Sequence, residues 1–388
     1  MDRLAWGGKG VARAEDGRLI LLEAPLALFP GEKVEAELRW KPRHGEGRVT
    51  RWIRKDPRRA AAGCPVAGVC GGCELWEAGP HQADLKRQMV EDLFHRQLGE
   101  LPWAWHPAPS EAKRHRIQLH WDGAALGFHR RNSHSVVPVR GCPAAVDPLS
   151  EAIPRLLEAI EGAVLPGRSQ RWELATGAPA GTVLATDESG RHWTLEPDGW
   201  HRGGDPIAEK VAGATLRHEA GGFFQVSPEW AAQAFGGLLA SWGVEGRTLF
   251  DLYGGVGLFS ALLRTRFQRF VLVESLEPAV AWARRNLADL RLDADCHAAD
   301  VAEWVTEGLG EPADLILLDP PRAGLDPALA EKLLTAKTDR MVLVGCDGAA
   351  FCRDLKRLAP AWSIGRLAAL DLFPLTHHVE CVALLKRA

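Results

Sequence analysis

Two residues near the C-terminus, Cys346 and Glu380, have the side chains that methyl transfer to a pyrimidine ring through a thiol intermediate requires. A thiolate that adds to C6 of uracil makes C5 nucleophilic, and a base must then remove the C5 proton before the thiol can leave. We therefore predict that Cys346 is the nucleophile and Glu380 the base. Cys352 is an alternative nucleophile, but it falls inside a predicted helix.

A glycine-rich turn in the segment DLYGGVGLF, residues 251–259, follows an apolar strand and precedes a helix. Glycines there let the backbone approach a ligand closely. Glu274 ends the next strand, where an acid can bind ribose hydroxyls at the carboxyl edge of an open α/β sheet. The pattern G-G-x-G leaves S-adenosylmethionine and another nucleotide both open.

The segment LLDPPRAGL, residues 317–325, places Asp319 at a strand end before two prolines. Proline fixes its own φ and restricts the preceding residue, so this turn is stiff and can hold a planar base beside a cofactor. Arg322 stands where amino-methyltransferases often carry an aromatic residue. This argues against methylation of an exocyclic amine.

Four cysteines form a set of candidate metal ligands: Cys64, Cys70, Cys73 and Cys142. Four thiolates serve either zinc or an iron–sulfur cluster. Three closely spaced cysteines and a remote fourth favour a cubane cluster over zinc, which usually uses two C-x2-4-C pairs. Unliganded thiols are the remaining alternative.

Composition and charge restrict the class of protein. The 388 residues are 46% hydrophobic and 25% charged, which predicts a globular protein of two or three domains. No apolar run is long enough for a membrane span, and the charged N-terminus lacks a signal peptide, so we expect a cytoplasmic protein. The net charge is only −3, but residues 39–59 hold nine Lys/Arg and two acids, and residues 111–140 hold six and two. These basic stretches indicate a polyanionic partner.

Three domains are expected from the order of the predicted elements. Residues 1–59 read as short strands between turns, which predicts a small OB-like β-barrel. Residues 60–215 read as a central α+β domain that carries the cysteines. In residues 216–388 apolar strands and helices alternate, which predicts a Rossmann-like α/β domain with a parallel sheet covered on both faces.

Motifs in both halves of the chain resemble one family. The segments GGFFQVS, DLYGGVGLF, LLDPPRAGL and FPLTHHVECVALL are similar to those of RNA uracil-5-methyltransferases, and residues 6–38 resemble a TRAM domain. The resemblance implies a class I S-adenosylmethionine-dependent methyltransferase fold and a [4Fe–4S] cluster on the four cysteines. It also implies an RNA substrate, with ribosomal RNA favoured over tRNA. We expect no membrane association and infer no protein partner. The residues it implies for S-adenosylmethionine binding are Gln225, Tyr253, Leu258, Glu274, Asp300 and Asp319.

The chain departs from the family pattern beside the nucleophile. The usual SCNP is replaced by Gly345-Cys346-Asp347-Gly348, although the following Arg353-Asp354-Leu355 is kept. A negative charge at Asp347 is expected to raise the pKa of the thiol. Two alternatives to uracil methylation therefore remain: an RNA cytosine-C5 methyltransferase, and a catalytically silent RNA-binding protein.

Overall fold

The N-terminal region is a five-stranded sheet in this computed structural model, which describes residues 1–308 and 312–388. The strand order is β1-β2-β3-β5-β4, antiparallel except for the parallel pair β3 and β5. The turn Pro30-Gly31 precedes β4, and Gly31 has a φ of +92° there. The strands are β1 Arg3–Leu4, β2 Gly10–Arg13, β3 Leu19–Glu23, β4 Lys33–Trp40 and β5 Gly45–Arg54.

The central region is an antiparallel sheet of seven strands in the order β13-β12-β11-β10-β7-β8-β9. Helix α2, Asp147–Glu161, packs its apolar face on this sheet around the buried Trp172. The sheet and this helix are consistent with the α+β character expected of the central region. The strands are β7 Arg116–Trp121, β8 Leu126–His129, β9 Val136–Pro138, β10 Arg171–Ala175, β11 Val183–Asp187, β12 His192–Glu196 and β13 Gly199–Arg202.

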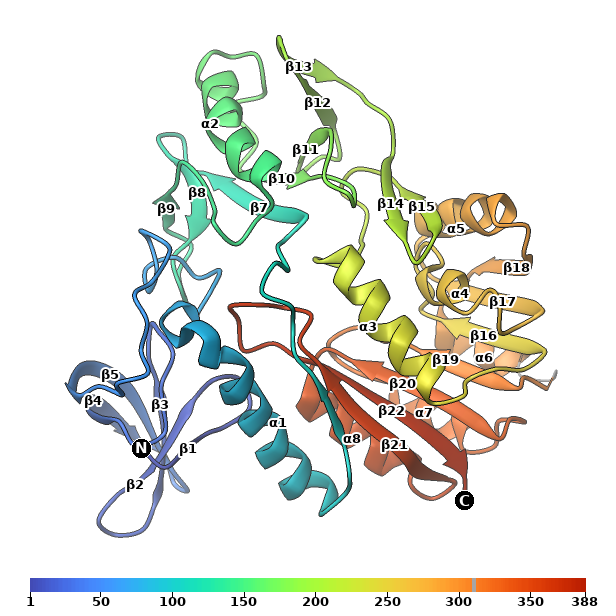
Figure 1. Cartoon of the computed structure of the whole chain (residues 1–388), viewed down its shortest axis with the longest axis horizontal. Coiled ribbons are helices and arrows are strands. Elements are labelled where there is room, and N and C mark those ends of the chain that lie inside the picture. The colour runs from blue at the N-terminus through green and yellow to red at the C-terminus, as the bar shows by residue number, and fades with distance from the viewer. Residues whose placement is uncertain (309–311) are drawn as a thin grey trace.

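The C-terminal region is an eight-stranded sheet in the order β18-β17-β16-β19-β20-β22-β21-β6, with helices on both faces (Figure 1). Strands β16 to β20 are parallel, as predicted, and β22 runs antiparallel to β20 and β21. The strands are β16 Thr248–Leu252, β17 Arg269–Glu274, β18 Asp293–Ala298, β19 Leu315–Leu318, β20 Arg340–Gly345, β21 Trp362–Leu370 and β22 Glu380–Arg387. The helices are α3 Pro228–Ser241, α4 Leu258–Leu262, α5 Glu277–Asp289, α6 Val301–Gly308, α7 Pro327–Leu333 and α8 Gly348–Leu358.

Two segments of the predicted central domain pack with the C-terminal sheet instead. After the short helix η1, Trp76–His81, helix α1, Gln82–Leu98, lies between the N-terminal sheet and α8 (Figure 1). It contributes Leu85 and Met89 to the N-terminal core, and Leu93 and Phe94 to the C-terminal core. Strand β6, Ala104–His106, then pairs with β21.

The second such segment is the hairpin of β14, Ile207–Val211, and β15, Ala214–His218. It packs on α3 and α5 of the C-terminal region. Helix α1, strand β6 and most of this hairpin lie within the predicted central domain, residues 60–215, but they pack with the N-terminal and C-terminal regions. Among the described residues, no helix has the length and hydropathy needed to cross a bilayer.

Candidate active site

The predicted functional residues form a row along one edge of the C-terminal sheet. Asp300 follows β18, Glu274 ends β17, Tyr253 follows β16, and Asp319 follows β19. Cys346 follows β20, and Glu380 begins the antiparallel β22. Because the parallel strands end at the same edge, the strand order sets the order of these side chains along it.

The glycine-rich turn lies in the middle of this row. Tyr253 has a φ of +62°, and Gly255 and Gly257 have φ values of +53° and +95°. A side chain at Gly254 would collide with Leu272, so the turn needs glycine there. The backbone amide of Gly255 donates a 3.3 Å hydrogen bond to the Glu274 carboxylate, which links the ends of β16 and β17.

A buried carboxylate supports the same turn from below. Asp251 accepts hydrogen bonds from the amide and hydroxyl of Ser260 on α4, at 3.0 and 2.6 Å. Its Oδ1 is buried and has no hydrogen-bond partner among the described residues. Burial raises the pKa of Asp251 to about 7, although the two Ser260 hydrogen bonds act in the opposite direction. This orphaned oxygen suits a ligand that donates a hydrogen bond or carries a positive charge.

The remaining predicted cofactor residues occupy different surroundings. Asp300 is exposed and caps α6 by accepting hydrogen bonds from Ala302 and Glu303. The Leu258 side chain is 8% exposed and belongs to a buried apolar cluster that includes Phe224. Gln225 is half-buried in the segment before α3, and its neighbour Phe223 is 71% exposed.

Cys346 and Glu380 lie opposite each other at the ends of two neighbouring antiparallel strands, β20 and β22. The antiparallel register pairs Gly345 with Cys381, so one further step places Cys346 opposite Glu380. Glu380 is 4% exposed, and its Oε1 is a buried atom with no hydrogen-bond partner among the described residues. Cys346 is half-buried and lines a small pocket with Pro320, Pro321 and other residues of the DPPRAG turn. An unpartnered buried carboxylate beside a thiol is suited to proton transfer.

The charges around this pair oppose ionisation of the thiol. Burial, followed by the carboxylates of Glu380 and Asp319, raises the pKa of Cys346 to about 11. Burial and the Asp319 carboxylate also raise the pKa of Glu380, while burial and Asp251 raise the pKa of Asp319 to about 7. The Arg322 guanidinium acts against these shifts at both Cys346 and Glu380. In the sequence, Arg322 argued only against amine methylation, and nothing there indicated this electrostatic role.

The departure from the SCNP pattern has a local explanation. Asp347 is the N-cap of α8 and accepts a 2.8 Å hydrogen bond from the Ala350 amide. The pKa of Cys346 is raised, which is the direction expected from Asp347, but the main causes are burial and the carboxylates of Glu380 and Asp319. A Cβ atom at Gly348 would lie 2.5 Å from Leu93 of α1 and 2.9 Å from the Trp6 ring. Glycine avoids this contact at the point where Trp6 and α1 pack against the loop that follows Cys346.

The Arg353-Asp354-Leu355 segment of α8 holds the DPPRAG turn in place. Asp354 is buried and accepts a 2.7 Å hydrogen bond from the Leu325 amide, while Arg353 donates to the Ala323 carbonyl at 2.6 Å. A Cβ atom at Gly324 would collide with both side chains, and its φ is +80°. Cys352, on the same helix, is 1% exposed within the core, so the structure removes it as a candidate nucleophile.

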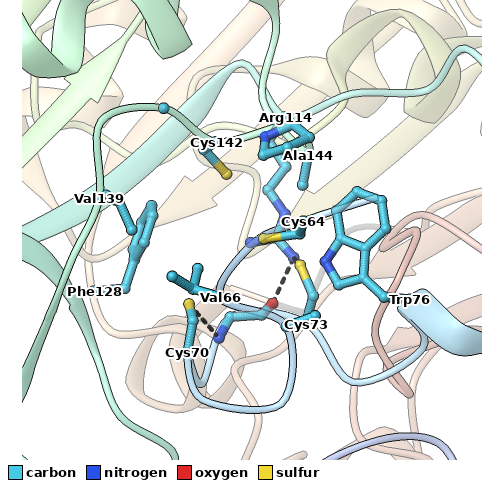
Figure 2. Close-up of a pocket in the computed structure, with 14 residues that line it drawn as sticks. Cys64, Val66, Cys70, Cys73, Trp76, Arg114, Phe128, Val139, Cys142 and Ala144 are labelled. Carbon is cyan, nitrogen blue, oxygen red and sulfur yellow. Dashed lines mark hydrogen bonds between the residues drawn. The ribbon is translucent and has the colours of Figure 1, made fainter. Parts of the chain in front are cut away.

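The four predicted metal ligands meet at a second site, away from the sheet edge. Figure 2 shows the sulfur atoms of Cys64, Cys70, Cys73 and Cys142 facing a common space, and all four line one cavity. Three come from the loop between β5 and η1, and Cys142 comes from the loop before α2. Gly71 is needed because a Cβ atom there would lie 3.1 Å from the His129 carbonyl oxygen.

Hydrogen-bond donors point at two of these sulfur atoms. The Gly72 amide donates to Cys70 Sγ at 3.4 Å, and Arg114 donates to Cys73 Sγ at 3.3 Å (Figure 2). Burial raises the pKa of Cys73 to about 11, and the Arg114 charge acts against that shift. Among the described residues, no three His, Cys, Asp or Glu side chains are arranged around a single metal ion. A set of four thiols can serve either zinc or an iron–sulfur cluster.

Sequence comparisons identify similar proteins over the full chain. A family model described as tRNA (Uracil-5-)-methyltransferase matches residues 312–388. An uncharacterized RNA methyltransferase of Streptomyces coelicolor is 34% identical, with 99% of this chain and 91% of that protein aligned. A 23S rRNA (uracil(1939)-C(5))-methyltransferase of Pseudomonas fluorescens is 30% identical, with 99% of this chain and 90% of that protein aligned.

A solved structure resembles the whole molecule. The tRNA (uracil-54, C5)-methyltransferase of Pyrococcus abyssi, in complex with S-adenosyl-L-homocysteine, matches with a TM-score of 0.73. The two chains are 26% identical, and the match covers 97% of this chain and 100% of the other. The arrangement of all three regions is therefore shared with a solved protein.

Proposed function

The chain belongs to the RNA uracil-5-methyltransferase family, and from that premise we propose that it methylates C5 of a uridine in RNA, with S-adenosylmethionine as methyl donor. The observation that carries the proposal is the pair of Cys346 and Glu380, which face each other beside Asp319 at the edge of the sheet. Uracil C5 is a poor nucleophile, so the reaction needs both a thiol and a base at the same ring.

The chemistry assigns one step to each residue. The Cys346 thiolate forms a bond to C6, and the electron pair of the C5–C6 double bond moves to C5 and the adjacent carbonyl. C5 then takes the methyl group, and S-adenosylhomocysteine is released. Glu380 removes the C5 proton, the double bond re-forms, and the C6–S bond breaks. The unpartnered Oε1 of Glu380 is the atom available to accept that proton.

The methyl donor is assigned to the other half of the row. S-Adenosylmethionine supplies an electrophilic methyl group on a sulfonium when it is bound. The left-handed turn at residues 253–257, the orphaned Oδ1 of Asp251 and the strand-end acids fit a ligand with an ammonium group and a ribose. The residues proposed to bind it are those predicted from the sequence: Gln225, Tyr253, Leu258, Glu274, Asp300 and Asp319.

Ribosomal RNA is the proposed substrate, because the Pseudomonas relative acts on 23S rRNA at 30% identity over the full chain. The Pyrococcus protein, which acts on tRNA, is the less similar of the two at 26%. We propose that residues 1–59 form the TRAM-type RNA-binding barrel. Trp40 of β4 is 42% exposed and carries Arg18 over its ring at 3.8 Å, an arrangement suited to an unpaired base.

A [4Fe–4S] cluster is proposed for the second site, held by Cys64, Cys70, Cys73 and Cys142. Such a cluster would tie the β5–η1 loop to the central region. All eight cysteines are free thiols, so all four of these are available as ligands. Protein purified without oxygen should be brown and contain about four irons per chain. A colourless protein that contains zinc would overturn this part of the proposal.

Release of tritium from [5-³H]uridine-labelled rRNA transcripts tests the reaction directly, because only C5 substitution displaces that atom. We expect release that requires S-adenosylmethionine and is lost in Cys346→Ala, which should still bind S-adenosylmethionine. Cys352→Ala is the matched control and should retain activity, since its thiol is buried in the core. Methyl transfer without tritium release would indicate cytosine as the target. Absence of both on rRNA and tRNA would favour an RNA-binding protein without activity.

A further inference from the structure

The segment that precedes Glu380 has no regular structure of its own. Residues 371–379 connect β21 to β22, and Leu375 in its middle has a φ of +66°, which is unusual for a leucine. The position of Glu380 at the first residue of β22 therefore depends on what holds this base loop, defined here as residues 371–379.

The loop between β5 and η1, residues 55–75, carries Cys64, Cys70 and Cys73 and is called the cysteine loop here. It holds the centre of the base loop. The backbone amides of Glu74 and Leu75 both donate to the Leu375 carbonyl oxygen, each at 2.9 Å. The Leu375 amide donates to the side-chain oxygen of Gln82 on α1 at 2.8 Å. Both polar backbone groups of this strained residue are thus satisfied by a segment that begins one residue after Cys73.

The Glu74 side chain adds a second connection. Its Oε1 pairs with Arg131 at 2.5 Å, and its Oε2 lies 3.5 Å from Nδ1 of His377 in the base loop. His377 also packs against Gly8 of the N-terminal region, where a Cβ atom would lie 3.2 Å from it. Glu74 therefore stands between the central region and the base loop.

The start of the base loop is fixed by a buried ion pair. Lys86 of α1 is fully buried and donates to Asp371 Oδ1 at 2.5 Å and to the Phe373 carbonyl at 2.8 Å. Asp371 is 1% exposed, and its carbonyl accepts a 2.7 Å hydrogen bond from the Trp230 ring. Separating the two side chains would leave each as an uncompensated buried charge, so this pair holds the start of the base loop against α1.

We infer that the cysteine loop and α1 form a clamp that positions the base Glu380, so that loading of the cysteine site orders the base loop. Gln82, Glu74 and Lys86 are positioning residues: they contact the loop that carries the base and do not contact the reacting ring. The inference rests on the proposed function for its catalytic consequence. Its structural consequence, order in residues 371–379, does not depend on that function.

The catalytic consequence is tested with Gln82→Ala, which removes the hydrogen bond to Leu375 at the clamp. With uridine RNA and S-adenosylmethionine, we expect the denaturant-stable protein–RNA adduct to form at the wild-type rate, and its release to slow by roughly tenfold. Gln97→Ala is the matched control, because Gln97 on the same helix bonds Lys356 at 2.7 Å far from the base loop. Slower adduct formation with unchanged release would overturn the positioning role.

The structural consequence is tested by hydrogen–deuterium exchange of the full-length protein with and without iron. On removal of the iron by a chelator, we expect peptides that span residues 371–379 to exchange about tenfold faster, and peptides of β16 and β19 to stay unchanged. Unchanged exchange in residues 371–379 would overturn the link to the cysteine site. If the wild-type protein formed no adduct even with 5-fluorouridine RNA, the proposed function would fail, and the exchange experiment would still decide the clamp.

Discussion

The two candidate sites of this molecule are built in different ways. At the sheet edge, each functional residue stands at the end of its own strand, so the order of parallel strands brings Asp300, Glu274, Tyr253, Asp319 and Cys346 into line. At the cysteine site, loops from two regions meet, and the guanidinium of Arg114, just before β7, completes the lining. The first site therefore depends on the sheet, whereas the second depends on contacts between regions.

The largest effect is expected at the sheet edge, for Glu380→Gln. The amide cannot take the C5 proton, so turnover should fall by about 10²–10⁴-fold, and a methylated covalent adduct with RNA should accumulate. Gel electrophoresis of the denatured protein with labelled RNA measures the adduct. Glu331→Gln, at an exposed position on α7, is the matched control and should resemble the wild type. A Glu380→Gln variant that turns over freely would remove Glu380 as the base.

The difference between the two sites also explains what could be predicted from the sequence. A catalytic residue at a strand end follows from local patterns, since apolar strands and glycine or proline turns mark where each strand stops. The parallel sheet and the strand-end positions of Glu274 and Asp319 were predicted in this way, whereas Cys346 and Glu380 were chosen for the chemistry of their side chains. The four cysteines were accessible too, because their spacing is a short-range signal.

The contacts between regions could not be predicted from the sequence. Lys86 and Asp371 are 285 positions apart, and nothing near either residue indicates the other. Strand β6 has only three residues and joins the sheet through β21 from the far end of the chain. The role of Trp6 against Gly348 depends on the docking of the N-terminal region. The glycine in place of the family's proline was the one local sign of that contact.

The second largest effect is expected for the buried ion pair that joins the regions. Lys86→Met leaves Asp371 as an uncompensated buried charge and should lower the free energy of unfolding by about 3–5 kcal/mol. Replacing both partners, as Lys86→Met with Asp371→Leu, should recover most of this loss. Denaturant unfolding measures both. Lys113→Met is the control, because Lys113 pairs with Asp147 at the surface, where such pairs contribute about 0–1 kcal/mol. Equal losses in the two single variants would contradict a distinction between buried and surface contacts.

A smaller effect is expected for Arg322, whose positive charge acts against the raised pKa of Cys346. A thiol with a pKa of about 11 is mostly protonated near neutral pH, so the rate of adduct formation with 5-fluorouridine RNA should rise with pH, by up to tenfold per unit between about pH 7 and 9. Arg322→Met should raise the pKa of Cys346 further and slow adduct formation by roughly tenfold at neutral pH, with partial recovery at higher pH. Arg366→Met, at an exposed position on β21, is the control. A rate that falls as pH rises would contradict this electrostatic role.

The smallest effect is expected at Gly348, where the N-terminal region and α1 contact the edge of the C-terminal sheet. In Gly348→Ala the new methyl group must displace the ends of Leu93 and Trp6, which should cost about 1 kcal/mol, near the lower limit for overpacking. Trp6→Ala in the same chain should remove part of this cost, because it opens space on one side of the methyl group. Gly237→Ala on α3 is the control, since nothing lies within 4 Å of a Cβ atom there. Thermal unfolding of the wild type, Gly348→Ala, Trp6→Ala and the double variant gives the coupling between Trp6 and Gly348 as the departure from additivity. Additive effects would mean that the N-terminal region does not constrain the nucleophile loop, and the sheet edge would then be independent of the rest of the molecule on the Cys346 side.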